Sequence, residues 1–252
     1  MITTSVLHKK IIMTKIAIIG DFNPDSRSHH LTNDAIAHSS KLLHNPFSYD
    51  WIETEQIDTH FHNITQNYKA FWIAPGGPFK NVEGALRLIE FARLNNRPTL
   101  GTCRGFQHMV LEFARNVLHI KEAAHAEYDP KATKPVVSPL TCNIRGQTLE
   151  IQIIDPSSKV SSILQTKKIQ EKYYCSFGLD YKYQDQIDKN GFKIVGVDDD
   201  NQARILELEN HPFFIGTLFV PQDSSTEEHP NKFVTAFLKA ASTLEFSAQG
   251  SN

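Results

Sequence analysis

A cysteine set between glycines marks the segment of this sequence that is best suited to chemistry. Gly101-Thr102-Cys103-Arg104-Gly105 follows a short apolar run and precedes a stretch with helical spacing. The G-x-C-x-G pattern is typical of a nucleophile elbow, because small neighbours permit a tight strand-to-helix turn that lifts the side chain out of the sheet. A helix N-terminus there would lower the thiol pKa, and its free N–H groups could hold an oxyanion. A buried structural cysteine beside a tight turn gives the same pattern, so both interpretations stay open.

The composition limits the kinds of protein in which this cysteine could act. The chain has 252 residues, a formal net charge of -2, 40% hydrophobic and 21% charged residues, which are ordinary globular values. The near-neutral net charge gives no sign of the basic surface that would attract nucleic acid or an anionic membrane. Three widely spaced cysteines without a C-x-x-C pair predict neither a disulfide framework nor a zinc site. No apolar run approaches the ~18 residues of a spanning helix. We expect a soluble, cytoplasmic protein with no metal and no cofactor.

The elements around the cysteine alternate between strand and helix. β-branched or apolar runs ended by Gly or Pro predict strands, and apolar residues at helical spacing predict helices. Thr32 is the expected N-cap of the first helix. The alternation argues for a doubly wound parallel sheet, in which loops at the carboxyl ends of the strands gather on one edge. The predicted strands are 15–21, 49–52, 70–74 and 98–101, and the predicted helices are 28–43, 82–94 and 105–118.

The second half of the chain differs from the first, because short strands and hairpins replace the alternation. We expect strands near 136–137, 149–154, 193–197, 203–208 and 213–219, then a closing helix at 231–244. No linker divides the chain. The predicted organisation is an N-terminal extension (1–14), a single domain (15–245) and a loose tail (246–252).

Several blocks of the chain, in order, resemble the glutaminase domain of the CTP synthase type, a class I (triad-type) glutamine amidotransferase. The resemblance runs from about Lys15 to Ala241. It is carried by Pro75-Gly76-Gly77, Val82-Glu83-Gly84, Phe91-Ala92-Arg93, Asn95-Asn96, the segment from Gly101 to Gln107, Glu112 to Val117, Glu127-Tyr128, Asn210-His211-Pro212 and Phe237 to Ala241. It implies a flavodoxin-like α/β fold with a central, mostly parallel sheet flanked by helices and additional antiparallel strands in the second half.

The resemblance also implies a set of site residues. Cys103 would be the nucleophile that attacks an amide, and ammonia would feed a synthetase domain, which is absent from this sequence. The residues expected to form the substrate pocket are Gly76, Gly77, Arg104, Gly105, Phe106, Gln107 and Glu127.

Three positions depart from the family pattern. Where the resemblance places a His and a Glu just before the last helix, this chain has Val220 and Gln222, neither of which can transfer a proton. Such a group typically contributes ~10²–10⁴ in rate. Where it places an arginine that grips the glutamine carboxylate, the chain has Ser176, which lacks the bidentate fork. We therefore expect ordinary glutaminase turnover to be crippled.

Other residues are candidates for the missing roles. Cys175 lies in a block that faces the substrate in the family, so it could be a second thiol, or it could be a small core residue among aromatic side chains. His125 is the first candidate for the base, since it lies in another such block, although loop histidines are common in this chain. His29 and His30, with aspartates nearby, could suggest a metal, but their spacing fits no standard site.

These observations leave three functions open. The first is a divergent amidotransferase-like enzyme that hydrolyses or transfers an amide (C–N) group through Cys103, with a non-standard base and a substrate other than free glutamine. The second is a catalytically silent protein that binds a metabolite or regulates a partner. The third is thiol chemistry between Cys103 and Cys175. We expect a small amide or amino-acid-like ligand. A separate synthetase subunit or a homodimer is compatible with the sequence, whereas nucleic acid and membrane are not expected partners.

Overall fold

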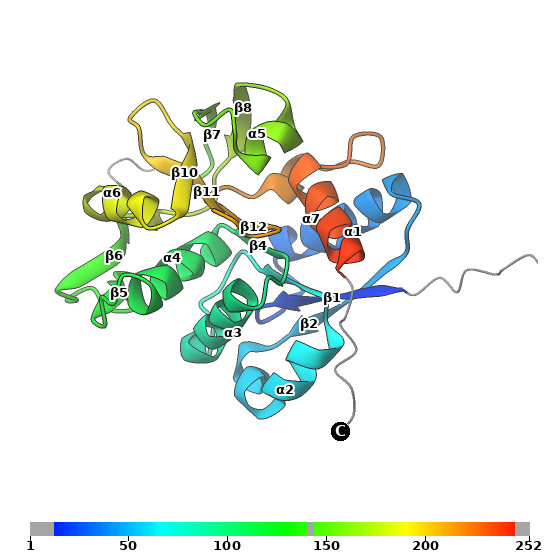
Figure 1. The fold of residues 1–252 in the computed structure, drawn as a ribbon, viewed down its shortest axis with the longest axis horizontal. Helices are drawn as coiled ribbons and strands as arrows, with labels where there is room; N and C mark the ends of the chain where they lie inside the picture. Colours follow the sequence, from blue (N-terminus) through cyan, green and yellow to red (C-terminus); the bar gives the residue numbers. More distant parts are fainter. Residues whose placement is uncertain (1–12, 141–143, 245–252) are drawn as a thin grey trace, which may run out of the picture.

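The computed structural model describes residues 13–140 and 144–244. A nine-stranded mixed sheet runs through the molecule in the order β2-β1-β3-β4-β12-β11-β10-β7-β8 (Figure 1). The strands from β2 to β12 in this order pair in parallel, and those from β12 to β8 pair antiparallel. This arrangement confirms the predicted mostly parallel sheet with antiparallel strands added by the second half of the chain.

The first half supplies the parallel strands and their crossover helices. Its elements are β1 (Thr14–Ile19), α1 (Arg27–Leu42), β2 (Phe47–Ile52), α2 (Ile57–Asn67), β3 (Ala70–Ile73), α3 (Val82–Leu94), β4 (Thr99–Thr102) and α4 (Arg104–Asn116). The predicted N-cap of α1 is wrong: Ser26 occupies that position, and Thr32 is buried inside the helix. The helix α2 was not predicted, because its segment is polar and only weakly periodic.

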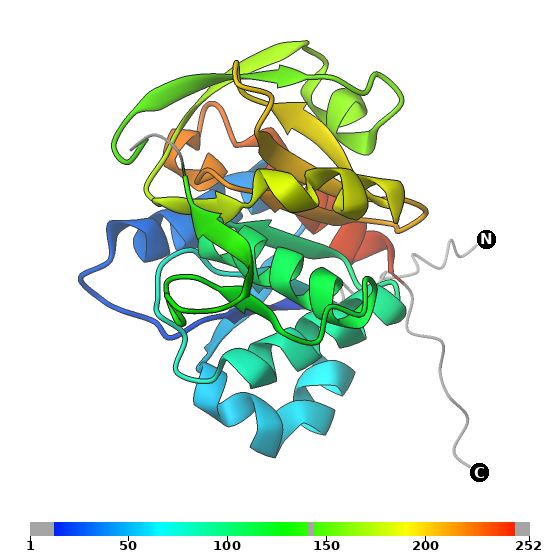
Figure 2. The same cartoon turned by 90° about the vertical axis from the view of Figure 1, so that its left-hand side faces the viewer.

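The second half supplies the remaining strands, a small second sheet and the closing helix. Its elements are β5 (Ala123–His125), β6 (Lys134–Pro139), β7 (Thr148–Ile153), α5 (Lys159–Leu164), β8 (Lys168–Lys172), β9 (Phe177–Leu179), α6 (Tyr181–Lys189), β10 (Phe192–Val197), β11 (Ala203–Leu208), β12 (Phe214–Thr217) and α7 (Lys232–Thr243). Strands β5, β6 and β9 form the second sheet, which lies beside α4 (Figure 2).

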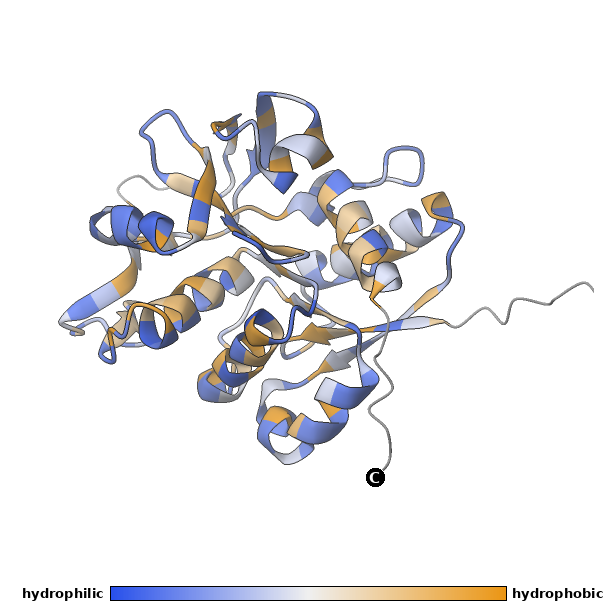
Figure 3. Ribbon diagram, viewed as in Figure 1, coloured by the Kyte–Doolittle hydropathy of each residue, from blue (hydrophilic) through white to orange (hydrophobic). Residues whose placement is uncertain are grey.

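Helices α1 and α7 pack together on one face of the sheet, and α3 and α4 pack together on the other (Figure 1). Apolar residues concentrate on the strands and on the helix faces turned toward them (Figure 3). The buried apolar residues form one continuous core, whose largest members are aromatic, such as Trp72, Phe106 and Phe237. Burial of such side chains stabilises the fold by roughly 25 cal/mol per Å² of apolar surface. The sheet is therefore a rigid platform for the loops at its edge.

The predicted limits of the N-terminal extension and of the tail fall mostly on residues 1–12 and 245–252, which lie outside the described residues. Cys142 also lies outside them. None of the helices within the described ranges is long and apolar enough to cross a membrane.

Candidate active site

Cys103 occupies a strained backbone position at the turn between β4 and α4. Its φ is 52° and its ψ is -101°, a region that costs an L-residue on the order of 1–3 kcal/mol. The flanking glycines make this turn possible. A Cβ at Gly101 would lie 2.2 Å from the Met109 sulfur, and a Cβ at Gly105 would lie 2.1 Å from the carbonyl oxygen of Ile73. The glycine spacing therefore has the steric reason that the sequence suggested.

The Cys103 sulfur lies among hydrogen-bond donors although the residue is only 6% exposed. Cys175, the Arg104 guanidinium and the backbone N–H groups of Arg104 and Gly76 all act electrostatically on it. The Cys175 interaction, followed by the Arg104 charge and the two N–H groups, lowers the pKa of Cys103 against the effect of burial. The same interaction, with burial, raises the pKa of Cys175. The pair therefore favours a thiolate on Cys103 and a protonated thiol on Cys175.

The two backbone N–H groups also define what the site can do chemically. They come from two different loops, one after β3 and one at the start of α4, and both stabilise negative charge on the sulfur. When a nucleophile attacks a carbonyl carbon, the carbonyl oxygen gains negative charge close to that nucleophile. Fixed N–H donors at that place stabilise the charge without reorganisation. Gly76 and Arg104 can therefore form an oxyanion hole.

His29 fixes the loop that carries Gly76. Its Nδ1 accepts the Asn23 N–H at 3.0 Å, so its Nε2 carries the proton and donates to the Pro75 carbonyl, also at 3.0 Å. Gly76 has a φ of 83°, and a Cβ there would lie 2.8 Å from His29 Nε2. Burial lowers the pKa of His29, which keeps the ring neutral. His29 thus supports the loop. No group of three metal-ligating side chains occurs within the described residues.

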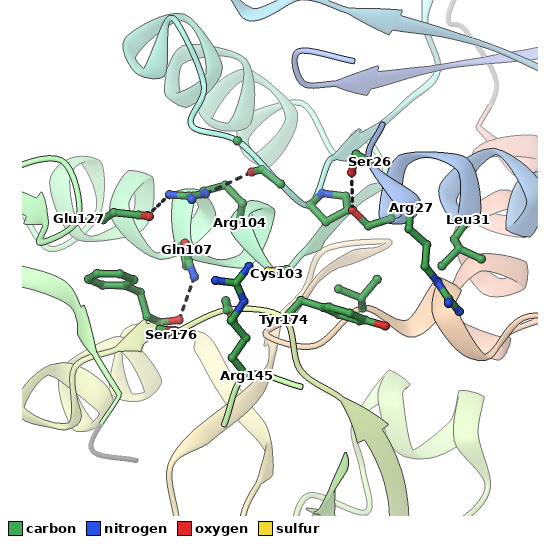
Figure 4. A pocket seen from close by; sticks show the side chains of 17 residues that line it. Ser26, Arg27, Leu31, Cys103, Arg104, Gln107, Glu127, Arg145, Tyr174 and Ser176 are labelled. Atoms are coloured by element: carbon green, nitrogen blue, oxygen red, sulfur yellow. Dashed lines mark hydrogen bonds and ion pairs between the residues drawn. The ribbon is translucent and has the colours of Figure 1, made fainter. Parts of the chain in front are cut away.

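A cavity of about 550 Å³ opens over the Cys103 sulfur (Figure 4). Of the expected site residues, Cys103, Cys175, Gly76, Gly77, Arg104, Gln107 and Glu127 line it, and the additional lining residues are Ser26, Arg27, Ser28, Leu31, Pro75, Arg145, Tyr174, Ser176, Phe177 and Val220. Gly105 and Phe106 are buried and do not line the cavity, because the first turn of α4 directs them to the core. Cys103 and Cys175 thus line the same cavity.

His125 does not line this cavity. It is 2% exposed, and both ring nitrogens bond within the protein: Nδ1 accepts the Glu127 N–H at 3.2 Å, and Nε2 donates to Gln107 Oε1 at 2.9 Å. Burial, with the nearby Arg104 charge, lowers the pKa of His125 to about 4. Gln107 Nε2 in turn donates to the Phe177 carbonyl at 2.8 Å. The ring therefore lies behind Gln107 and orients its amide.

The segment where the resemblance predicts His and Glu follows β12. Val220 is fully buried and forms an apolar wall of the cavity. Gln222 donates from Nε2 to Thr32 Oγ1 at 2.9 Å, while its Oε1 has no hydrogen-bond partner in the structure. No described residue that lines the cavity is a histidine. The site therefore presents two thiols in a cavity whose described lining contains no imidazole.

Three arginines from distant parts of the chain reach the cavity. Arg104 donates to the Gly76 carbonyl at 3.2 Å and forms an ion pair with Glu127. Arg27 forms an ion pair with Asp223 at 3.1 Å. Figure 4 shows Arg145 entering from the side opposite Arg104. The lining thus contains three arginines and one glutamate.

Arg27, Arg145 and Tyr174 line the cavity but were not predicted from the sequence. For Arg27 a signal existed, since it follows the first strand, and loops at the carboxyl ends of strands meet at one edge. For Arg145 there was none, because it lies in a turn before β7 that only the tertiary fold brings to the cavity.

The architecture and the elbow together define a class of protein, and sequence comparison agrees with it. A family model described as "Glutamine amidotransferase class-I" matches residues 33–240. The chain belongs to this family.

Within the family, the chain is similar to curated CTP synthases. It is 30% identical to the CTP synthase of Cytophaga hutchinsonii over 248 residues, which cover 93% of this chain and 46% of that protein. It is also 30% identical to the CTP synthase of Sulfolobus acidocaldarius over 238 residues, covering 90% of this chain and 45% of that one. The chain thus spans about half the length of these relatives.

Solved structures show the same fold. One described as the glutaminase domain of Trypanosoma brucei CTPS with bound acivicin superposes with a TM-score of 0.84 at 21% identity, covering 93% of this chain and 96% of that one. A structure described as a glutamine amidotransferase from Thermotoga maritima gives a TM-score of 0.58 at 9% identity, covering 91% of this chain and 96% of that one.

Proposed function

We propose that this protein hydrolyses or transfers the acyl group of a small anionic amide through Cys103, and that free glutamine is not its substrate. The observation that carries this proposal is the position of Cys103, which lies at a strained turn before α4 and lines a cavity of about 550 Å³ together with Gly76 and Arg104. The three arginines in the lining favour a ligand with an acidic group. Ser176, in place of an arginine, argues against the binding mode expected for glutamine itself.

The reaction begins when the Cys103 thiolate attacks the carbonyl carbon, with the developing oxyanion held by the two N–H groups. The C–N bond then breaks, the amine leaves with a proton, and an acyl thioester remains on Cys103. Water or an acceptor amine releases the acyl group. Because no described residue of the lining is a histidine, the Cys175 thiol is the proposed donor to the leaving amine. His125, whose ring lies behind Gln107, is proposed to position that amide; a role for it as base stays a prediction.

The test is to trap the acyl-enzyme. The protein is incubated with L-glutamine, and separately with small carboxylate-bearing amides and thioesters, and examined by intact mass and peptide mass spectrometry. We expect an acyl adduct on Cys103 with at least one acidic compound, absent in Cys103→Ala, and negligible ammonia release from glutamine. Ammonia release at a rate normal for a glutaminase, abolished by Cys103→Ala, would contradict the proposed change of substrate. Ser176→Arg is the matched variant, since it restores the guanidinium that glutamine binding is expected to need.

A catalytically silent binding protein is the alternative outcome of the same experiment. If no compound forms an adduct but one of them protects Cys103 from alkylation, the cavity binds without reacting. A separate synthetase subunit is the proposed partner in the enzymatic case, because the CTP synthases that the chain resembles are about twice as long. A homodimer is also compatible, and the cytoplasmic location stays a prediction.

A further inference from the structure

Two thiols that line one cavity are an unusual feature of this site. Cys103 lies at the elbow before α4, and Cys175 lies in the loop between β8 and β9, so the fold brings together residues far apart in the sequence. Both are free thiols and both line the same cavity. The Cys175 S–H donates to the Leu218 carbonyl at 3.4 Å, and the Cys175 thiol is also electrostatically coupled to Cys103 across the cavity. The two sulfurs are thus placed for direct chemistry between them.

We infer that Cys103 and Cys175 are a redox pair, in which Cys103 reduces a small hydroperoxide that enters the cavity and Cys175 then closes a disulfide with it. This activity goes beyond the proposed acyl transfer and does not depend on it. The oxidant class is a hydroperoxide, ROOH, and the reductant class that restores the pair is a dithiol.

The step balances as a two-electron oxidation. The Cys103 thiolate attacks one peroxide oxygen, the O–O bond breaks, and the alkoxide takes a proton to leave as ROH. Cys103 is then a sulfenic acid, S–OH. The Cys175 sulfur attacks the Cys103 sulfur, its proton goes to the departing hydroxide, and water and a disulfide form. A dithiol reduces the disulfide by exchange and is itself oxidised.

The surroundings of the two sulfurs assign their roles. Cys103 has the Arg104 charge and the N–H groups of Arg104 and Gly76 around it, which favour the thiolate and can stabilise negative charge on the leaving oxygen. The Arg204 and Arg104 charges also act on Cys175, but its S–H donates to the Leu218 carbonyl, an acceptor, which favours the protonated thiol. The interaction with Cys103, with burial, raises the pKa of Cys175. Cys103 is therefore the attacking group and Cys175 the resolving group.

The cavity lining near the two thiols includes an apolar side chain. Val220 lines the cavity together with both sulfurs. An imidazole at that position would compete with Cys175 for a hydrogen bond to the thiolate. With a valine there, the second thiol is the side-chain partner of the Cys103 sulfur, and the sulfenic acid formed on oxidation has a thiol beside it. This geometry directs oxidation toward the disulfide before a second peroxide can react.

The experiment treats the reduced full chain with one equivalent of hydrogen peroxide and follows peroxide consumption and intact mass. For the wild type we expect loss of two hydrogens, a Cys103–Cys175 crosslink in non-reducing peptide maps, and recovery with dithiothreitol. In Cys175→Ser we expect a gain of one oxygen at Cys103, trapped by dimedone. In Cys103→Ser we expect peroxide consumption to fall at least about tenfold, since Cys103 is the thiol whose surroundings favour a thiolate. Cys142→Ser is the control and should behave as the wild type.

Several outcomes would overturn the inference. These are a crosslink that contains Cys142, direct conversion of wild-type Cys103 to a sulfinic acid with no disulfide, and equal peroxide consumption by Cys103→Ser. The mapping of the disulfide uses the wild-type protein alone, so this test stays valid even if a variant folds poorly. Failure of acyl trapping leaves these results unaffected, and a missing disulfide leaves acyl transfer possible, so the two proposals fail separately.

Discussion

Replacing Cys175 should raise the pKa of the Cys103 thiol, because the interaction between the two thiols is the largest cause of its lowered pKa. A hydrogen bond to a charged group contributes about 1.5–3 kcal/mol, and one pKa unit corresponds to about 1.4 kcal/mol. Cys175→Ala should therefore raise the Cys103 pKa by about 1–2 units. The Arg104 charge and the two backbone N–H groups remain, so the pKa should not rise further. Cys175→Ser keeps a donor in place and should give a smaller rise.

The assay is the rate of Cys103 alkylation by iodoacetamide as a function of pH, read at the Cys103 peptide by mass spectrometry. Ser176→Ala is the matched control, because Ser176 is the exposed neighbour of Cys175 and also lines the cavity. Circular dichroism checks that each variant is folded. An unchanged or lower Cys103 pKa in Cys175→Ala would refute the role given to the interaction of the two thiols, as would preferential alkylation of Cys142 in the wild type.

Three further predictions concern groups around the site and in the core. His125→Ala should destabilise the protein by about 1–3 kcal/mol, since it leaves Gln107 Oε1 unpaired. The pH dependence of Cys103 alkylation should stay unchanged in this variant. A rise of the Cys103 pKa by more than about one unit would instead give His125 the role of base. Burial, with the Asp223 charge, raises the pKa of Glu171 from 4.5 to about 8. The contribution of Glu171 to stability is thus full below pH 4.5 and lost as the pH rises through 8. In thermal unfolding, Glu171→Gln should therefore stabilise the protein by about 1–3 kcal/mol at pH 8 and by little near pH 4. Equal effects at both pH values would contradict this. Arg93 pairs at 2.7 Å with Glu112, which is fully buried, so Arg93→Met should cost about 3–5 kcal/mol in urea unfolding, and adding Glu112→Leu should recover most of it.

The regular part of the fold could be predicted because its signals are local. Helix α3 lies where the periodicity placed it, and β1 and β3 are buried, mostly apolar runs that end before Gly or Pro segments. The elements that were missed lack such signals. Strand β8 lies at the edge of the sheet and carries charged residues, and α5 has only six residues. Their positions depend on tertiary packing, which overrides weak local preference.

The residues of the site also divide into those that could be predicted from local sequence and those that could not. The elbow at Cys103 could be predicted because Gly101 and Gly105 report a steric requirement within five residues. The approach of Cys175 was expected only through the family resemblance. The burial of His125 could not be foreseen, since a histidine in a short strand carries no sequence mark that separates a core position from a cavity position. Its place behind Gln107 follows from two hydrogen bonds that only the folded chain creates.

The two proposed activities share one nucleophile, and this links them. Acyl transfer needs the Cys103 thiolate free and the Cys175 thiol protonated, whereas oxidation joins the two sulfurs and removes both. A peroxide that enters the cavity would therefore stop acyl transfer until a dithiol restored the pair. The strain at Cys103 favours a chemical role over a structural one, because a buried cysteine that served only packing would gain nothing from a φ of 52° beside two N–H donors. The same donors that favour attack on a carbonyl also favour attack on a peroxide, so the choice between the two reactions depends on which molecule enters the cavity.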